Sequence, residues 1–128
     1  MIFLSYSSED KNIAEQVYFA LVGYGFEVFF DQTNLRPSGD YNLSIRQAIY
    51  ESDIFIFLIS PTSVLKTAYS LTELKFAQEK WKHPKDHVLP VIIRSTEIDD
   101  IPNYLKAVTI YTPSGNIAAE ISSLVNQE

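Results

Sequence analysis

The short segment Thr67–Leu74 contains one carboxylate, Glu73, which follows an aromatic residue and a serine in the sequence. Tyr69 lies four residues before it and Ser70 lies three residues before it. A carboxylate can serve as the catalytic group of an enzyme, and it can equally be an ordinary first-turn acid that the helix dipole favours. Positions 76 and 77 carry no basic residue, so an ion pair along the helix does not explain Glu73.

Other catalytic signatures are missing from the sequence. No glycine-rich phosphate loop of either common type occurs, and no Gly-x-Ser-x-Gly elbow is present. His83 and His87 are four residues apart, but Pro84 between them breaks a helix, so we interpret them as loop residues and predict no metal site. An aspartyl-phosphate receiver would need an aspartate where the third apolar run ends, and Ser60 stands there.

Length, composition and charge exclude several classes of protein. The 128 residues fit one domain, and the 46% hydrophobic content supports a buried core. A net charge of −6 argues against nucleic-acid binding. The N-terminus lacks the features of a signal peptide, and no apolar run reaches the ~20 residues of a membrane span. The chain contains no cysteine, which suits a reducing compartment, and we expect a cytoplasmic location without membrane contact.

The chain alternates between strand and helix patterns. Strands are predicted where short apolar runs end at polar or turn residues, and helices where apolar residues recur at a spacing of three and four. Gly25 ends the first predicted helix, and Pro90 inside the fourth strand favours an edge or a bulge. The predicted strands are 1–5, 26–30, 53–60, 87–93 and, weakly, part of 101–111; the predicted helices are 9–24, 41–49, 71–81 and 117–125.

This alternation predicts an α/β domain with a flavodoxin-like fold in three layers, in which helices cover both faces of a five-stranded parallel sheet. The third strand, apolar on both faces, is predicted to be central. The loops after Ser5, Asp31 and Ser60 would then lie at the same edge of the sheet, where ligands bind in such folds. Glu73 follows the third of these loops, so it can face the same crevice.

Three segments in order resemble the Toll/interleukin-receptor (TIR) domain, and the resemblance covers nearly the whole chain. "IFLSYSSED" resembles the first box of that family. "VFFDQTNLRPSGD" resembles its second strand and the following BB loop, and "SPTSVLKTAYSLTEL" resembles the approach to a Glu-Leu pair. Tyr69-Ser70 replaces the family's common Trp-Cys, Ser38 is an extra loop residue, and the third box of receptor-type domains is not visible. The resemblance therefore points to a bacterial-type domain.

The resemblance implies an activity and a site. Some TIR domains cleave NAD⁺ at the nicotinamide–ribose bond as effectors of cell death or antiphage defence, and in them the glutamate of the Glu-Leu pair is catalytic; here that residue is Glu73. NAD⁺ is then the substrate, and no cofactor or metal is needed. The implied substrate-binding residues are Ser5, Tyr6, Ser7, Asp31, Arg36 and Tyr69.

The family also implies partners and an alternative. Other TIR domains would pack against the loop Asn34–Tyr41, so the active form would be a homo-oligomer. A non-catalytic adaptor that binds other TIR domains is the second function left open. Residues 1–128 are expected to be a single TIR domain. Because TIR domains usually stand beside a sensor or oligomerisation domain, this domain could have been cut from a larger protein.

Overall fold

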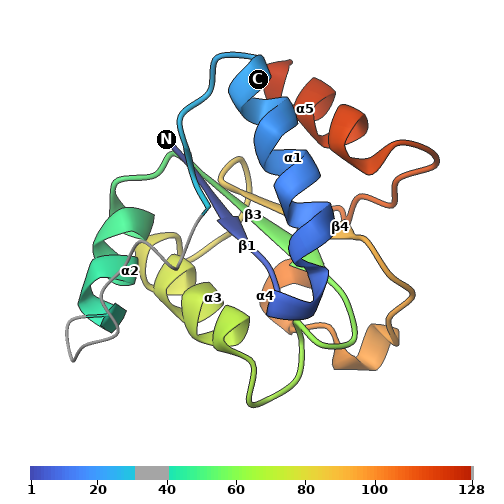
Figure 1. Ribbon diagram of the computed structural model, residues 1–128. Coiled ribbons are helices and arrows are strands. Elements are labelled where there is room, and N and C mark those ends of the chain that lie inside the picture. The colour runs from blue at the N-terminus through green and yellow to red at the C-terminus, as the bar shows by residue number, and fades with distance from the viewer. Residues whose placement is uncertain (31–40, 128) are drawn as a thin grey trace.

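The computed structural model describes residues 1–30 and 41–127, and in them four parallel strands form one sheet between two layers of helices (Figure 1). Each of these strands pairs in parallel with its neighbours, and their order is the flavodoxin-like one. The predicted α/β class, parallel sheet and three layers are confirmed. In sheet order the strands are β2 (Val28–Phe29), β1 (Ile2–Ser5), β3 (Ile54–Ile59) and β4 (Val88–Ile92).

Helices lie on both faces of the sheet, as Figure 1 shows. A short 3-10 turn, η1 (Ser8–Asp10), leads into α1 (Lys11–Gly23), which packs beside α5 (Ile117–Asn126) on one face. On the other face α2 (Tyr41–Tyr50) packs against α3 (Tyr69–Lys80). The short η3 (Ile98–Asp100) and α4 (Asn103–Lys106) follow β4.

Two apolar cores follow from the alternation of side chains along the strands. Phe3 and Phe55 point into the core beneath α2 and α3, where their rings stack at a centroid distance of 5.3 Å. Ile2, Leu4 and Ile56 point into the core beneath α1 and α5. Because β3 contributes fully buried side chains to both cores, its predicted central position is confirmed.

The predicted helix end at Gly25 is confirmed by the backbone. Helix α1 stops at Gly23, and Gly25 has φ of +93°, a conformation that side chains with a Cβ rarely adopt. The amide of Gly25 donates to the carbonyl oxygen of Val22 at 2.9 Å. This turn directs the chain into β2.

Residues 101–111 do not form the predicted fifth strand, and this prediction is wrong. Ile101 and Leu105 are buried four residues apart, which is a helical spacing, and Pro102 starts the short α4. Strand character survives only at Tyr111, whose amide donates to the Pro90 carbonyl and whose carbonyl accepts from the Ile92 amide, both at 2.9 Å. The apolar pattern of this segment predicted a strand only weakly, and the helical turn that follows Pro102 forms in its place.

Pro90 lies in β4, which is an edge strand of the described sheet, as predicted. The amide of Ile93 donates to the carbonyl oxygen of Ile59 in β3. The backbone groups of Pro90 and Ile92 point to the opposite side of the strand, where they hydrogen-bond with Tyr111. The nitrogen of Pro90 thus points away from β3, where its missing N–H breaks no bond of the ladder.

The end of α3 is tied to the end of α2 by Lys80. Its ammonium group donates to the carbonyl oxygens of Ile49, Tyr50 and Ser52 at 3.3, 2.6 and 2.5 Å. Burial lowers the pKa of Lys80, and the Asp53 carboxylate partly opposes that shift. Next along the chain, Trp81 is buried in the apolar core.

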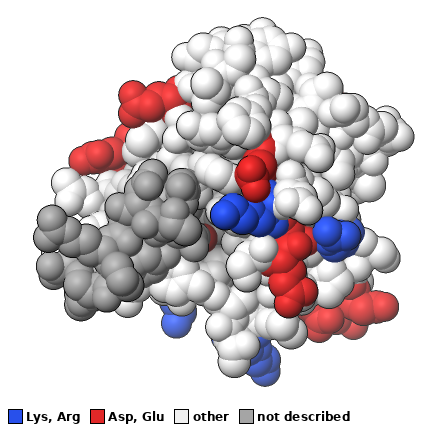
Figure 2. All heavy atoms as spheres, in the orientation of Figure 1, with Lys and Arg blue, Asp and Glu red and all other residues white. Residues whose placement is uncertain are grey.

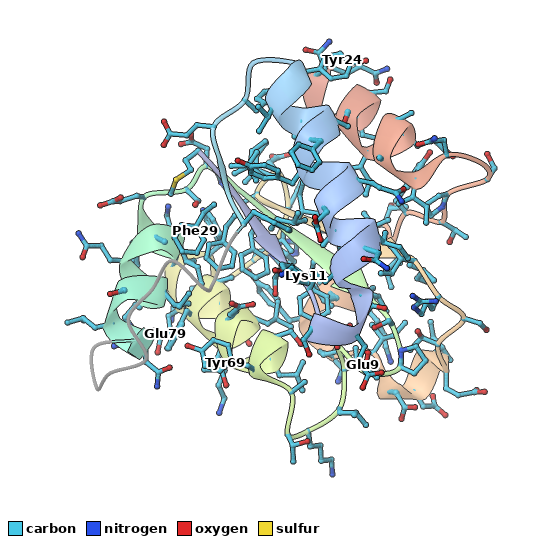
Figure 3. All side chains as sticks on the ribbon, in the orientation of Figure 1. Glu9, Lys11, Tyr24, Phe29, Tyr69 and Glu79 are labelled. Atoms are coloured by element: carbon cyan, nitrogen blue, oxygen red, sulfur yellow. The ribbon has the colours of Figure 1, made fainter. Side chains whose placement is uncertain are left out.

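A second link between these two helices lies on the surface. Arg46 of α2 pairs with Glu79 of α3 at 3.1 Å, and both side chains are nearly half exposed. Figure 3 shows Glu79 on the side of α3 that faces α2. This pair and the Lys80 contact both link α3 to α2.

The described helices and the face drawn in Figure 2 bear on membrane and nucleic-acid contact. Among the described residues, no helix is both long enough and apolar enough to cross a bilayer. On the face that Figure 2 shows, basic side chains stand singly, some of them beside acidic ones.

Candidate active site

The carboxyl edge of the sheet brings together residues from both halves of the chain. Ser5 ends β1 opposite Phe57, and Ser60 directly follows β3. Helix α3 starts at Tyr69, two residues earlier than predicted, so Tyr69 and Ser70 lie in its first turn. Tyr69 and Glu9 both lie at the lower end of the view in Figure 3, the end toward which β1 points in Figure 1.

Ser5 and Glu73 form the central contact of this edge. The Ser5 hydroxyl donates to Oε1 of Glu73 at 2.7 Å, although the two residues are 68 positions apart. Both side chains are 0% exposed. A carboxylate that is fully removed from water must be hydrogen-bonded to be tolerated, and Ser5 provides one such bond. Glu73 is therefore not the solvated first-turn acid of the alternative interpretation.

Two tyrosines flank a small cavity at this edge. The Tyr6 ring stacks on Phe30 at a centroid distance of 5.3 Å, and its hydroxyl donates to the Phe30 carbonyl at 3.4 Å. The Tyr69 hydroxyl donates to Oδ1 of Asn42 in α2 at 2.5 Å. The cavity measures about 290 Å³ and is lined by Tyr6, Ser7, Ser8, Glu9, Thr62, Leu65, Ala68, Tyr69 and Ser70.

Glu73 lies directly behind this cavity. Tyr69 and Ser70 line it, and residues four and three positions apart on a helix share a face, so Glu73 follows them one turn deeper. Its carboxylate does not belong to the cavity wall. The site thus consists of an open part bounded by tyrosines and serines and a buried acid at its back.

The structure brings together most, not all, of the residues predicted for the site. Ser5, Tyr6, Ser7 and Tyr69 meet around Glu73 or the adjoining cavity. Ser7 precedes η1, and its side chain makes no capping hydrogen bond there. Asp31, Arg36 and the whole BB loop up to Asp40 lie outside the described residues.

One buried acid at this edge was not predicted. Asp10 lies in the first turn of the predicted helix 9–24, where acids are commonly solvated, yet it is only 1% exposed. Its Oδ1 accepts from Nε of Arg94 at 2.6 Å, and its Oδ2 accepts from the Ser60 hydroxyl at 2.5 Å. No local pattern signals this contact, because Arg94 is 84 residues away.

Serines continue this network toward α3. The amide of Ser63 donates to the Ser60 hydroxyl at 3.1 Å, and the amide of Ser60 donates to the Ser63 hydroxyl at 2.9 Å. The Ser70 hydroxyl then donates to the Ser63 carbonyl at 2.6 Å. A continuous chain of hydrogen bonds therefore leads from Asp10 to the turn of α3 that precedes Glu73.

A larger cavity lies at the opposite, amino edge of the sheet. It measures about 750 Å³, and it is bounded by the starts of β3 and β4 and by the end of α5. His83 and His87 line it, both in the loop where they were predicted. Within residues 1–30 and 41–127, no group of three or more histidines and acids is placed to hold a metal ion.

Comparison with known proteins identifies a family and a fold. A sequence model described as the TIR domain matches residues 2–123. No curated protein sequence matches the chain. The solved TIR domain of the Toll-related receptor TRR-2 from Hydra magnipapillata is similar, with a TM-score of 0.74, 19% identity, and coverage of 98% of this chain and 95% of that one.

Two further solved structures extend this likeness. A metazoan TIR-STING receptor from C. gigas, in complex with 2′,3′-cGAMP, gives a TM-score of 0.78 at 22% identity; 97% of this chain covers 38% of that one. The TIR domains of the activated Roq1 resistosome, which directly recognises the pathogen effector XopQ, give a TM-score of 0.68 at 16% identity over 98% and 96% of the two chains. At these identities the likeness shows the fold.

Proposed function

The chain belongs to the TIR domain family, and on this premise we propose that it cleaves NAD⁺ at the bond between nicotinamide and ribose, with Glu73 as the catalytic residue. The observation that supports this proposal is a fully buried glutamate, hydrogen-bonded to Ser5, behind a cavity with a tyrosine on either side. Acids in such positions cluster at functional sites more often than solvated surface acids do.

The reaction needs one carboxylate and no metal. As the bond between the ribose C1′ and the nicotinamide nitrogen breaks, both electrons stay with the nitrogen, so the cationic ring leaves as neutral nicotinamide. Positive charge then develops on the sugar, as in glycoside cleavage. The Glu73 carboxylate stabilises that charge, and a preorganised acid shielded from water does so most effectively. Water adds to C1′ and releases a proton to give ADP-ribose; attack by the adenine instead would give a cyclic product.

The other residues act on the substrate around this step. The Ser5 hydroxyl holds the Glu73 carboxylate in one orientation. Tyr6 and Tyr69 present rings to the cavity on which the nicotinamide or adenine can stack, and the Ser7 hydroxyl can meet a phosphate. Asp31 and Arg36, from the segment that the structure leaves undescribed, complete the proposed set, with Arg36 as the charge partner of the phosphates.

We also propose that activity requires self-association. The similarity to TIR domains of the Roq1 resistosome supports an assembled active form. The loop Asn34–Tyr41, with Arg36 and Pro37, is the proposed contact. Such an enzyme would act in the cytoplasm, where NAD⁺ is available, in cell-death or antiphage signalling.

A non-catalytic adaptor is the second candidate function. One observation favours it: Glu73 is 0% exposed and does not line the cavity, so a substrate must displace neighbouring groups to reach the acid. An adaptor would keep Glu73 only as a buried hydrogen-bond acceptor that fixes Ser5 and α3. Under this alternative the chain binds other TIR domains and leaves NAD⁺ intact.

Incubation of the protein with NAD⁺ distinguishes the two functions. We expect nicotinamide and ADP-ribose, or a cyclic form of it, by mass spectrometry, with specific activity that rises over about a hundredfold range of protein concentration, since association supplies the second domain. Joint replacement of Arg36 and Pro37 by alanine should lower both assembly, measured by light scattering, and turnover. Absence of nicotinamide at every concentration would favour the adaptor, and constant specific activity from a monomer would remove the requirement for assembly.

A further inference from the structure

Three segments form the walls of the cavity in front of Glu73. Each wall contains or adjoins a residue of the buried polar network, which consists of Asp10, Ser60, Ser63 and Ser70. The first wall, residues 7–9, ends at Asp10. The second, with Thr62 and Leu65, follows Ser60. The third is the start of α3, with Ser70. The first wall is joined to the second by the contact between Asp10 and Ser60, and the second is joined to the third by Ser70.

Counting protons fixes the direction of these hydrogen bonds. The Asp10 carboxylate can only accept, so the single hydroxyl proton of Ser60 goes to it. The contact of 3.1 Å between the hydroxyls of Ser60 and Thr62 must then be donated by Thr62. Because Thr62 lines the cavity, the charge on Asp10 sets the orientation of a hydroxyl that a substrate would meet.

Arg94 holds Asp10 from outside. Its Nε contacts Oδ1 of Asp10 at 2.6 Å, while the arginine side chain is 52% exposed and the aspartate side chain is 1% exposed. A buried carboxylate with one basic partner is strongly dependent on that partner. The geometry of the cavity is thus linked to an arginine that solvent can reach.

We propose that Asp10 is a positioning residue of this site: through Ser60 it fixes the distance between two walls of the cavity and the direction of the Thr62 hydroxyl, and Arg94 keeps it in place. The effect on catalysis rests on the proposed NAD⁺ cleavage. Asp10 lies on the network and not on the cavity wall, so it acts through its neighbours. Small displacements of substrate-binding groups cost as much as about a hundredfold in rate.

The test replaces Asp10 by asparagine, which keeps the shape but not the charge. The amide oxygen can still accept from Arg94, whereas the amide nitrogen now donates to Ser60 and lets the Thr62 contact reverse. We expect KM for NAD⁺ to rise about tenfold, or kcat/KM to fall by about that factor, in protein that is still folded. Arg94→Ala should have a similar effect, and Arg94→Lys should restore part of the loss. The control is Arg46→Ala, which removes an exposed arginine from the pair with Glu79.

Hydrogen exchange gives a readout that does not need activity. Asp10→Asn should accelerate amide exchange in both segments 7–9 and 62–70, and Arg46→Ala should accelerate neither. Unchanged kinetic constants in Asp10→Asn, in protein whose wild type is active, would overturn the proposal. If the wild type does not cleave NAD⁺, the proposed function fails, and amide exchange alone tests the structural role of Asp10. Faster exchange in both segments of Asp10→Asn would support Asp10 as the link between the walls. Unchanged exchange would overturn that link.

Discussion

The two edges of the sheet carry cavities of opposite character. The cavity at the amino edge is the larger, about 750 Å³ against about 290 Å³ at the carboxyl edge. Yet its polar lining residues, which are His83, Lys85, Asp86, His87, Lys106 and Thr109, are all exposed. Behind the smaller cavity lie buried acids, Glu73 and Asp10, each with a hydroxyl donor.

The difference separates a large cavity with an exposed polar lining from a small cavity backed by buried acids. The exposed lysines and histidines that line the larger cavity keep most of their hydration, so this lining contains no buried charge that would need a placed partner. Buried carboxylates lose hydration and must be compensated by placed donors, which orients both the acid and its neighbours. The proposed active site lies at the carboxyl edge for this reason, and each prediction below tests one side of this contrast.

The largest effect is expected at Glu73. Glu73→Gln keeps the size of the side chain and removes its charge, so we expect NAD⁺ cleavage to fall by about a hundred- to a few thousandfold, equivalent to about 3–5 kcal/mol of transition-state stabilisation. Glu79→Gln makes the same change six residues later on the exposed face of α3 and should leave the rate unchanged. Rates are measured as nicotinamide release at equal concentrations. Equal turnover by Glu73→Gln and wild type would assign catalysis elsewhere.

A smaller effect, on stability, is expected when Arg94 is removed. Arg94→Ala leaves Asp10 buried without its basic partner, but water can enter beside the half-exposed arginine position. We therefore expect the free energy of unfolding to fall by about 2 kcal/mol, below the full cost of breaking a buried pair. Arg46→Ala, at the exposed pair, should cost less than about 1 kcal/mol. Urea denaturation of both variants measures the difference, and equal losses would show that burial of Asp10 has no special weight.

Glu120 is a half-buried acid with several hydrogen-bond donors, so its burial lies between that of the exposed lining at the amino edge and that of the buried acids at the carboxyl edge. It accepts from the Tyr111 hydroxyl and from the amides of Ser114 and Gly115. These hydrogen bonds, the Tyr111 one first, lower the pKa of Glu120 below 4.5, so its stabilising contribution is present above that pH and is lost as pH falls through the lower folded value. Glu120→Gln should lower Tm by about 2–5 °C at pH 7 and by less in acid. A difference in Tm that does not shrink below pH 4.5 would contradict this assignment.

The smallest effect is expected at the amino edge. Joint replacement of Lys85 and Lys106 by alanine removes two exposed charges from the larger cavity. The free energy of unfolding should change by less than about 0.5 kcal/mol, and NAD⁺ cleavage should be unaffected. A loss of activity comparable to that of Glu73→Gln would reverse the contrast between the two edges.

Local patterns were enough to predict most of the fold. The buried run of β3, the glycine after α1 and Pro90 in an edge strand each have a short-range physical cause. The fifth strand was mispredicted because an apolar run with a weak period can fold as a proline-started helix, as Leu105 shows. Helix α3 was predicted two residues late because Ser70 is a typical N-cap residue, whereas the helix begins after Ala68, whose side chain cannot cap it.

The candidate site was only partly predictable. The resemblance to TIR domains pointed to Glu73 and to Ser5, and the structure brings these two side chains together, while the role of each stays a prediction. Asp10 could not be distinguished from Glu9 next to it, because the partners that bury it come from distant strand ends. Pairings of this kind depend on the topology of the sheet, which a local pattern does not contain.

The outer edge of β4 has a consequence for how copies of the domain can meet. Three residues of the strand face outward: the Val88 amide already donates to Pro84, the Ile92 amide donates to Tyr111, and Pro90 has no amide hydrogen. An incoming strand would therefore find no free donor along this edge, which protects the sheet from intermolecular β-pairing and from the aggregation that exposed edges invite. Contacts between copies at this edge must therefore use side-chain surfaces, because sheet extension at β4 finds no free amide donor.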